Sequence, residues 1–186
     1  MKDIDLTHHF LIAMPSMADP HFAKTVTYIC EHGEHGALGL VINRPTEINL
    51  ATLFRQIDLP LDDEALGAYP VHFGGPVHGD RGFVLHTPPG GWKESLPVQG
   101  GMALTTSKDV LEALGRGEGP EKFFITLGYA GWSPGQLEHE LAQNAWLTVG
   151  ASPELIFDLP DAAKLDAAMH LLGIDFSRLS EQVGHA

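Results

Sequence analysis

Apolar residues in this chain gather in short runs that alternate with Gly, Pro, Asn and Asp. Runs rich in β-branched and aromatic residues, bounded by such residues, are typical of buried strands. The pattern predicts strands at residues 10–14, 25–30, 36–42, 71–73, 82–86, 102–105, 123–127 and 146–150. The polar residues 31–35 between the second and third runs predict a hairpin loop.

Helices are predicted where apolar residues recur at helical spacing after a capping residue. These are residues 50–57 after Asn49, a helix after Thr106 or Ser107, and residues 162–172, with a further start at Ser152-Pro153. The clearest start is Ser133-Pro134, because Gln136 completes a capping box and Trp132 with Leu137 forms a hydrophobic staple. Residues 123–127 should therefore end in a sharp turn at Gly128 before a helix capped by Ser133.

Strands occur in pairs early in the chain and alternate with helices later. This order favours a mixed sheet with helices packed against it, the α+β class, over a doubly wound parallel sheet. A chain of 186 residues with 44% hydrophobic content fits one compact domain over residues 1–186.

Composition also restricts the compartment and the partners. Cys30 is the sole cysteine, which excludes an intrachain disulfide and fits a reducing compartment. No apolar run approaches about 18 residues, so we expect a soluble cytoplasmic protein without a membrane span. With a formal charge of −13 and eleven Lys and Arg scattered singly, direct nucleic-acid binding is disfavoured.

Several motifs in this order resemble the AlgH/YqgE family of bacterial proteins. The matching segments are residues 10–15, 19–20, 28–32, 39–45, 74–77, 104–107, 127–132 and 135–138, and the likeness extends from about residue 6 to Ala186. The resemblance implies one α+β domain with a strongly curved, partly barrel-like sheet flanked by helices. One branch of that family carries the label of transcriptional regulator, linked to alginate production. The family has no agreed DNA-binding motif and no agreed catalytic residues.

Three irregular segments follow predicted strands and are candidates for a binding cleft. If they meet at one end of the sheet, exposed amides, aromatic walls and one fixed positive charge would suit a peptide segment or a carboxylate. The alternative is that their glycines only permit close packing of turns. The candidate residues are Asn43, Arg44, Pro45, Gly74, Gly75, Pro76, Arg81, Gly128, Tyr129, Gly131 and Trp132.

Cys30, His32 and His35 lie on or beside the predicted hairpin loop. A zinc site is one interpretation, although structural zinc takes four ligands and usually more than one cysteine. Alternatively, Cys30 is a reactive thiol or a buried strand residue, and the histidines are solvated loop residues.

No complete catalytic constellation can be read from the sequence. A Gly-x-Ser-x-Gly elbow is missing, and Ser107 and Ser133 are explained as helix caps. Acid-base chemistry would need Glu31, Asp109 or Glu138 to lie beside a reacting group, and their spacing in the sequence does not indicate this. No cofactor motif occurs. We therefore expect a non-enzymatic interaction or regulatory module with a protein or peptide partner. A small-ligand protein or enzyme using the glycine-rich cleft, and a direct DNA-binding regulator, are the alternatives.

Overall fold

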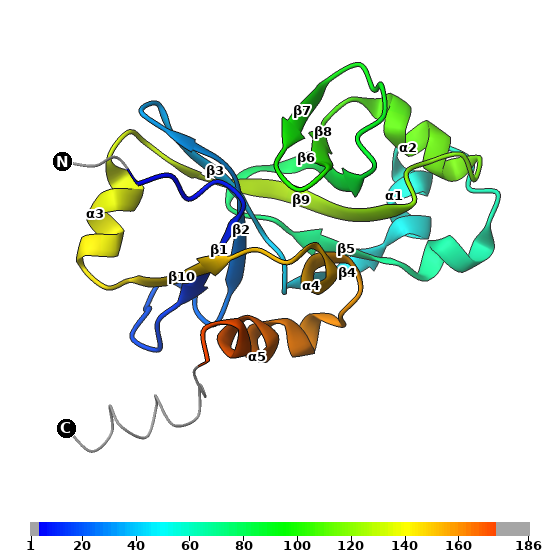
Figure 1. Ribbon diagram of the computed structural model, residues 1–186. Coiled ribbons are helices and arrows are strands. Elements are labelled where there is room, and N and C mark those ends of the chain that lie inside the picture. Colours follow the sequence, from blue (N-terminus) through cyan, green and yellow to red (C-terminus); the bar gives the residue numbers. More distant parts are fainter. Residues whose placement is uncertain (1–3, 174–186) are drawn as a thin grey trace.

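The sheet is organised around one long strand, β9 (Lys122–Trp132), in the computed structural model, which describes residues 4–173. β9 pairs antiparallel with β3 at one end and with β6 along most of its length, and it pairs parallel with β5. Figure 1 shows β9 crossing the molecule and joining two groups of strands. Within the described residues the sheet has ten strands, in the order β10-β1-β2-β3-β9-β6-β8-β7, with β4 and β5 branching from β9.

The remaining strands are β1 (His9–Ala13), β2 (Val26–Gly33), β3 (Gly36–Val41), β4 (Pro45–Asn49), β5 (Pro70–Phe73), β6 (Val77–Thr87), β7 (Ser95–Val98), β8 (Met102–Thr105) and β10 (Trp146–Gly150). The helices are α1 (Leu50–Gln56), α2 (Lys108–Gly115), α3 (Gln136–Ala142), α4 (Pro153–Phe157) and α5 (Asp161–Leu171), with a 3-10 turn, η1 (Glu64–Ala68).

Helices cover the curved sheet in three places, and each makes its own hydrophobic cluster. Leu155 of α4 and Met169 of α5 pack with strand residues such as Tyr28. Helix α3 contributes Leu137 to a second cluster, and α1 and α2 share a third. The mixed sheet, its curvature and the flanking helices confirm the predicted α+β class. No helix within residues 4–173 combines the length and the apolar character that crossing a membrane requires.

Capping residues and apolar patterns in the sequence predicted the positions of most helices and strands correctly. The hairpin of β2 and β3 forms, and α1 begins after Asn49, whose Oδ1 accepts a hydrogen bond of 3.0 Å from the Thr52 amide. Helix α4 begins with Pro153 directly after Ser152. These features depend on contacts between residues close in sequence, so the sequence alone is sufficient to predict them.

The region around Gly128 differs from the prediction. β9 continues through Gly128 to Trp132, and the positive φ of 78° at Gly128 accompanies an interruption in the pairing with β6 rather than a turn. Helix α3 consequently begins later, with Gly135 as its N-cap. Half of the predicted capping box remains, because the Gln136 side chain accepts a hydrogen bond of 3.0 Å from the Ser133 amide. The short strands β4 and β7 were also not predicted.

Candidate functional site

The segment containing Asn43 and Arg44 anchors a loop instead of presenting a free charge. The Arg44 guanidinium donates hydrogen bonds to the carbonyls of Pro20, His21 and Ala23 at 2.7, 3.0 and 2.7 Å. The Asn43 side chain adds a bond of 3.0 Å from the amide of Val26. All of Arg44's observed partners are neutral backbone groups, so its charge serves to hold the preceding loop. Pro45 begins β4.

The glycine segments do meet, but they pack backbone against backbone. Gly74 donates to the Leu127 carbonyl at 2.9 Å, and its own carbonyl accepts from Val41 at 2.8 Å. A side chain at Gly75 would overlap the backbone of Tyr129, and one at Gly128 would overlap Gly75. The close-packing alternative therefore explains why glycine occupies these positions.

The other candidates lie apart from this contact. Pro76 is exposed, directly after Gly75, and Gly131 is exposed near the end of β9. The Arg81 side chain is exposed, 3.9 Å from Glu94. Trp132 is buried and donates a hydrogen bond of 3.0 Å from Nε1 to Glu140.

The structure separates Cys30, His32 and His35. Cys30 is buried in the α4-α5 cluster, and burial raises the pKa of its thiol far above the usual range, so the thiol is protonated at neutral pH. His32, also buried, accepts from the Leu6 amide at 3.0 Å and bonds Glu138, whereas the His35 side chain is 95% exposed. Within residues 4–173, no three His, Cys, Asp or Glu side chains lie close enough together to hold a metal ion. The zinc interpretation therefore has no set of ligands among these residues.

A cavity of about 370 Å³ lies where α4 and α5 approach β5 and β9. We call it the His72 cavity. Its volume falls within the range of small-ligand pockets. The wall is largely aromatic and apolar, and its residues are Tyr69, Pro70, His72, Phe123, Phe124, Ile125, Phe157, Asp158, Leu159, Pro160, Asp161 and Lys164.

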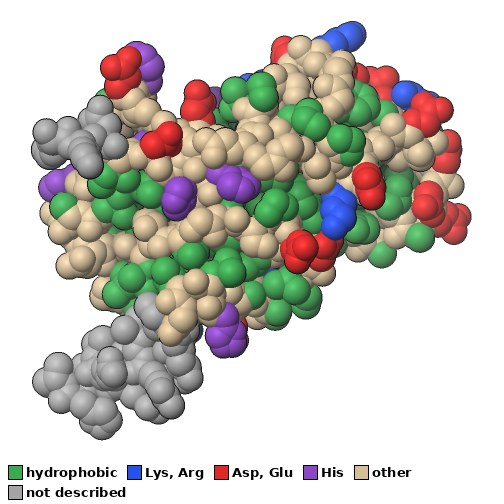
Figure 2. Space-filling view, viewed as in Figure 1, with side chains coloured by type: hydrophobic (Ala, Val, Ile, Leu, Met, Phe, Trp, Pro, Cys, Tyr) green, Lys and Arg blue, Asp and Glu red, His purple; other side chains and the backbone are tan. Residues whose placement is uncertain are grey.

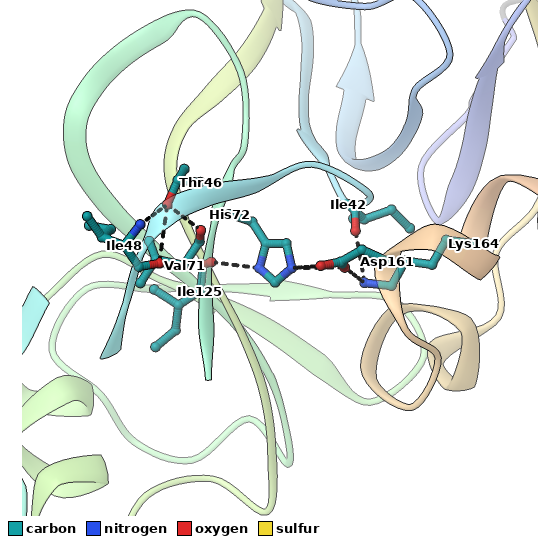
Figure 3. Close-up of polar contacts among 8 residues, drawn as sticks. All are labelled: Ile42, Thr46, Ile48, Val71, His72, Ile125, Asp161 and Lys164. Carbon is teal, nitrogen blue, oxygen red and sulfur yellow. Dashed lines mark hydrogen bonds and ion pairs between the residues drawn. The ribbon is translucent and has the colours of Figure 1, made fainter. Parts of the chain in front are cut away.

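A buried polar cluster forms one side of the cavity (Figure 3). Lys164 is 2% exposed, and its ammonium group donates to the Ile42 carbonyl at 2.8 Å and to Asp161 Oδ1 at 2.9 Å. The same ammonium lies 4.4 Å from the centre of the Phe124 ring. The Asp161 carboxylate, the Ile42 carbonyl and the face of the Phe124 ring together replace the water that a charged lysine loses on burial.

Asp161 also binds His72, which shares the carboxylate oxygen Oδ1 with Lys164. His72 Nε2 lies 2.9 Å from both carboxylate oxygens, and Nδ1 lies 3.4 Å from the Ile125 carbonyl. The imidazole ring stacks on Phe124, with ring centres 4.0 Å apart. Nearby, Thr46 joins β4 to β5 by donating to the Val71 carbonyl at 2.6 Å, which positions the strand that carries His72.

The pKa values of the two charged groups shift in the same direction for different reasons. Burial lowers the pKa of Lys164, and the hydrogen bond and charge of Asp161 offset only part of that effect. Burial by itself would raise the pKa of Asp161, but hydrogen bonds from His72 and Lys164 outweigh it and leave the pKa below its usual range. The cavity therefore combines an ionised carboxylate with a lysine whose protonated form is disfavoured.

Sequence reasoning missed His72, Asp161 and Lys164. His72 and Asp161 are 89 residues apart, so no local spacing indicates that they meet. Lys164 offered one usable signal: it shares an apolar helix face with Ala168, four residues later, and both are buried. A lysine at such a position requires a buried acceptor, and Asp161, on the same helix, provides one.

Fold and site together define a class: α+β proteins with a strongly curved sheet, in which a buried Lys-Asp-His cluster adjoins an aromatic cavity. A model of the AlgH-like family matches residues 10–177, and the chain belongs to this family, which confirms the resemblance seen in the sequence.

Two relatives and one solved structure match this chain over its full length, and a second solved structure matches most of it. A UPF0301 protein of Chromobacterium violaceum is 62% identical and one of Nitrosospira multiformis is 58% identical, each over the full length of both chains. The solution structure of AlgH from Pseudomonas aeruginosa is similar with a TM-score of 0.81 and 52% identity over both full chains. Protein DIP2367 of Corynebacterium diphtheriae, at 20% identity and a TM-score of 0.66 over 89% of this chain and 85% of its own, shares the fold.

Proposed function

We propose that this protein is a non-enzymatic interaction module that binds a partner protein by accepting an apolar side chain in the His72 cavity. The observation that carries the proposal is the exposure of Tyr69 and Leu159 in the cavity wall, 45% and 37% respectively. Only four large hydrophobic residues within residues 4–173 are exposed to this degree, and two of them border one cavity. Exposed apolar residues grouped around a pocket are typical of protein contacts.

Charge favours a partner segment with a basic residue beside the apolar anchor. Asp158 and Asp161 both belong to the cavity wall, where the sole Lys or Arg is the buried Lys164. Lys122 pairs with Asp158 from outside the wall, at 2.9 Å. The chain carries a net charge of −13, and Figure 2 shows many more acidic than basic side chains on the visible face. Complementary charge increases the association rate and selects against acidic partners.

Selection from a phage-displayed random peptide library on the full chain tests this proposal. We expect the enriched peptides to share an aromatic or leucine anchor with Lys or Arg close by. Fluorescence anisotropy on synthetic peptides should show affinity at least about tenfold weaker for Tyr69→Asp and Leu159→Asp, because losing a hot-spot contact costs about 2 kcal/mol or more and about 1.4 kcal/mol is tenfold in affinity.

Leu171→Asp is the matched control, since Leu171 is 48% exposed on α5 and lies outside the cavity wall. Its peptide affinity should equal that of the wild type. Saturable peptides that bind the Leu159→Asp variant as well as the wild type would place the interaction elsewhere. Failure to enrich any saturable peptide would refute a peptide-binding role for this cavity.

A further inference from the structure

We propose that Lys164 is a nucleophilic amine that captures an aromatic or aliphatic aldehyde in the His72 cavity as a reversible imine. The inference uses the same cavity as the proposed function but requires no partner segment. It rests on three features that occur together: a lysine among the residues of the cavity wall, a carboxylate within hydrogen-bond distance of its ammonium group, and an aromatic lining.

The surroundings of Lys164 suit an amine that reacts. The groups that face its Nζ are the Asp161 carboxylate at 2.9 Å, the Ile42 carbonyl at 2.8 Å and the Phe124 ring at 4.4 Å. Burial lowers the pKa of this lysine, which increases the fraction of free amine. Desolvated lysines in apolar pockets are the usual imine-forming residues of proteins.

Asp161 is placed to move the proton that the reaction requires. The ammonium loses a proton along its hydrogen bond to the carboxylate, which passes the proton on to solvent because its own pKa is low, and the freed nitrogen pair attacks the carbonyl carbon. As the carbon–nitrogen bond forms, the carbonyl π electrons move to oxygen. Protons passing through Asp161 convert that oxygen to water, which leaves as its bond to carbon breaks. One ammonium and one aldehyde thus give one protonated imine and one water, so the positive charge beside Asp161 is preserved.

The aldehyde's apolar portion would contact the aromatic wall. Phe123, Phe124 and Phe157 line the cavity, whose volume of about 370 Å³ accommodates a substituted benzene ring. His72 bonds both oxygens of the Asp161 carboxylate and stacks on Phe124, so it is a positioning residue for the carboxylate and does not contact the reacting carbon.

Lys122 provides an internal reference for the reaction. It lies beside the cavity, and its hydrogen bond to Asp158 raises its pKa, opposite to the shift at Lys164. The free-amine fraction at pH 7 is larger for the lysine with the lower pKa, so we expect Lys164 to react faster than Lys122.

Treatment of the full chain with benzaldehyde and cyanoborohydride at pH 7 tests the proposal. Cyanoborohydride delivers hydride to the imine carbon and leaves a stable benzyl-lysine, which is read by intact mass and located by peptide mapping. The α-amino group, with a pKa of about 7.7–8.0, also reacts at pH 7 and is identified by the peptide map; among the lysines, the expected result is one benzyl group, at Lys164. Lys164→Arg should lose this label, and Lys122→Arg should retain it.

Peptide mapping of the labelled wild-type protein identifies the modified lysine directly. The test therefore remains decisive even where Lys164→Arg does not fold. A label spread over the surface lysines with Lys164 unmodified would overturn the proposal, as would equal rates at Lys122 and Lys164. Labelling without any peptide ligand would support the imine even where the peptide selection fails, so the two proposals can fail separately.

Discussion

Lys164 donates a hydrogen bond of 2.8 Å to the carbonyl of Ile42, a residue 122 positions earlier in the chain. The bond connects α5 to the sheet directly after β3. Asp161 extends the connection to β5 through His72. One buried cluster therefore fixes α5 against two strands and also forms one side of the His72 cavity, so changes to this cluster should alter both stability and ligand capture.

Removing the lysine should destabilise the fold strongly. Lys164→Ala removes the buried ammonium and leaves the partly buried Asp161 carboxylate, 18% exposed, without that partner, and breaking a buried pair costs up to about 3–5 kcal/mol. Urea denaturation gives the unfolding free energy. Lys122→Ala, which removes an exposed pair with Asp158, is the control and should be nearly neutral. Equal losses for the two variants would contradict the importance of the buried cluster.

Asp161 should contribute an acid-sensitive part of the stability. Its pKa is lowered in the folded protein, so between that value and the unfolded value of about 3.9 the unfolded chain binds more protons. The stabilisation is fully present above about pH 4 and is lost as pH falls through the folded pKa. The difference in unfolding free energy between wild type and Asp161→Asn should therefore shrink at acid pH. A difference independent of pH would show that the carboxylate's charge is not responsible.

The contrast between α1 and the Lys164 cluster explains what the sequence can predict here. Asn49 caps α1 through a residue three positions away, so the cap can be recognised locally. Lys164, His72 and Ile42 meet only because β3, β5 and α5 converge in the folded chain. The glycines at 74, 75 and 128 were interpreted as part of a binding cleft. The sequence cannot distinguish a glycine that permits close backbone packing from one that makes room for a ligand.

Arg44 and Arg81 were both candidates for a ligand-binding charge, but their surroundings predict different roles. Arg44→Ala removes three hydrogen bonds to loop carbonyls, and loss of such charge-assisted bonds should cost about 1.5–3 kcal/mol. Arg81→Ala removes an exposed side chain 3.9 Å from Glu94 and should change the unfolding free energy by less than about 0.5 kcal/mol. Thermal or urea unfolding measures the loss of stability in the two variants. An equally small loss for both would show that Arg44 does not anchor the loop.

Cys30 should be unreactive in the native protein. The side chain is 3% exposed and burial raises its pKa, so both access and thiolate formation are disfavoured. Ellman's reagent should detect no fast-reacting thiol in buffer and one thiol per chain in denaturant. Rapid native reaction at neutral pH would instead restore the reactive-thiol interpretation of the sequence.

His86 should remain neutral at a pH where exposed histidines are protonated. It is fully buried, with Nδ1 3.0 Å from the Pro88 carbonyl and Nε2 2.6 Å from the Thr105 hydroxyl. Burial lowers its pKa, and the bond to Pro88 offsets part of that effect.

Between the lowered pKa of His86 and about 6.5 the unfolded chain binds more protons than the folded protein. The stabilisation from His86 is therefore complete above that pH window and decreases as pH falls through it. A nitrogen-15 NMR titration should show His86 titrating below the unperturbed histidine pKa of about 6.5, with the proton of the neutral ring on Nδ1. Thr105→Val, which leaves the buried His86 Nε2 without its hydrogen-bond partner, should cost about 1–3 kcal/mol by urea denaturation. Titration of His86 at or above about pH 6.5 would show that water reaches the ring and would refute the buried hydrogen-bonded arrangement.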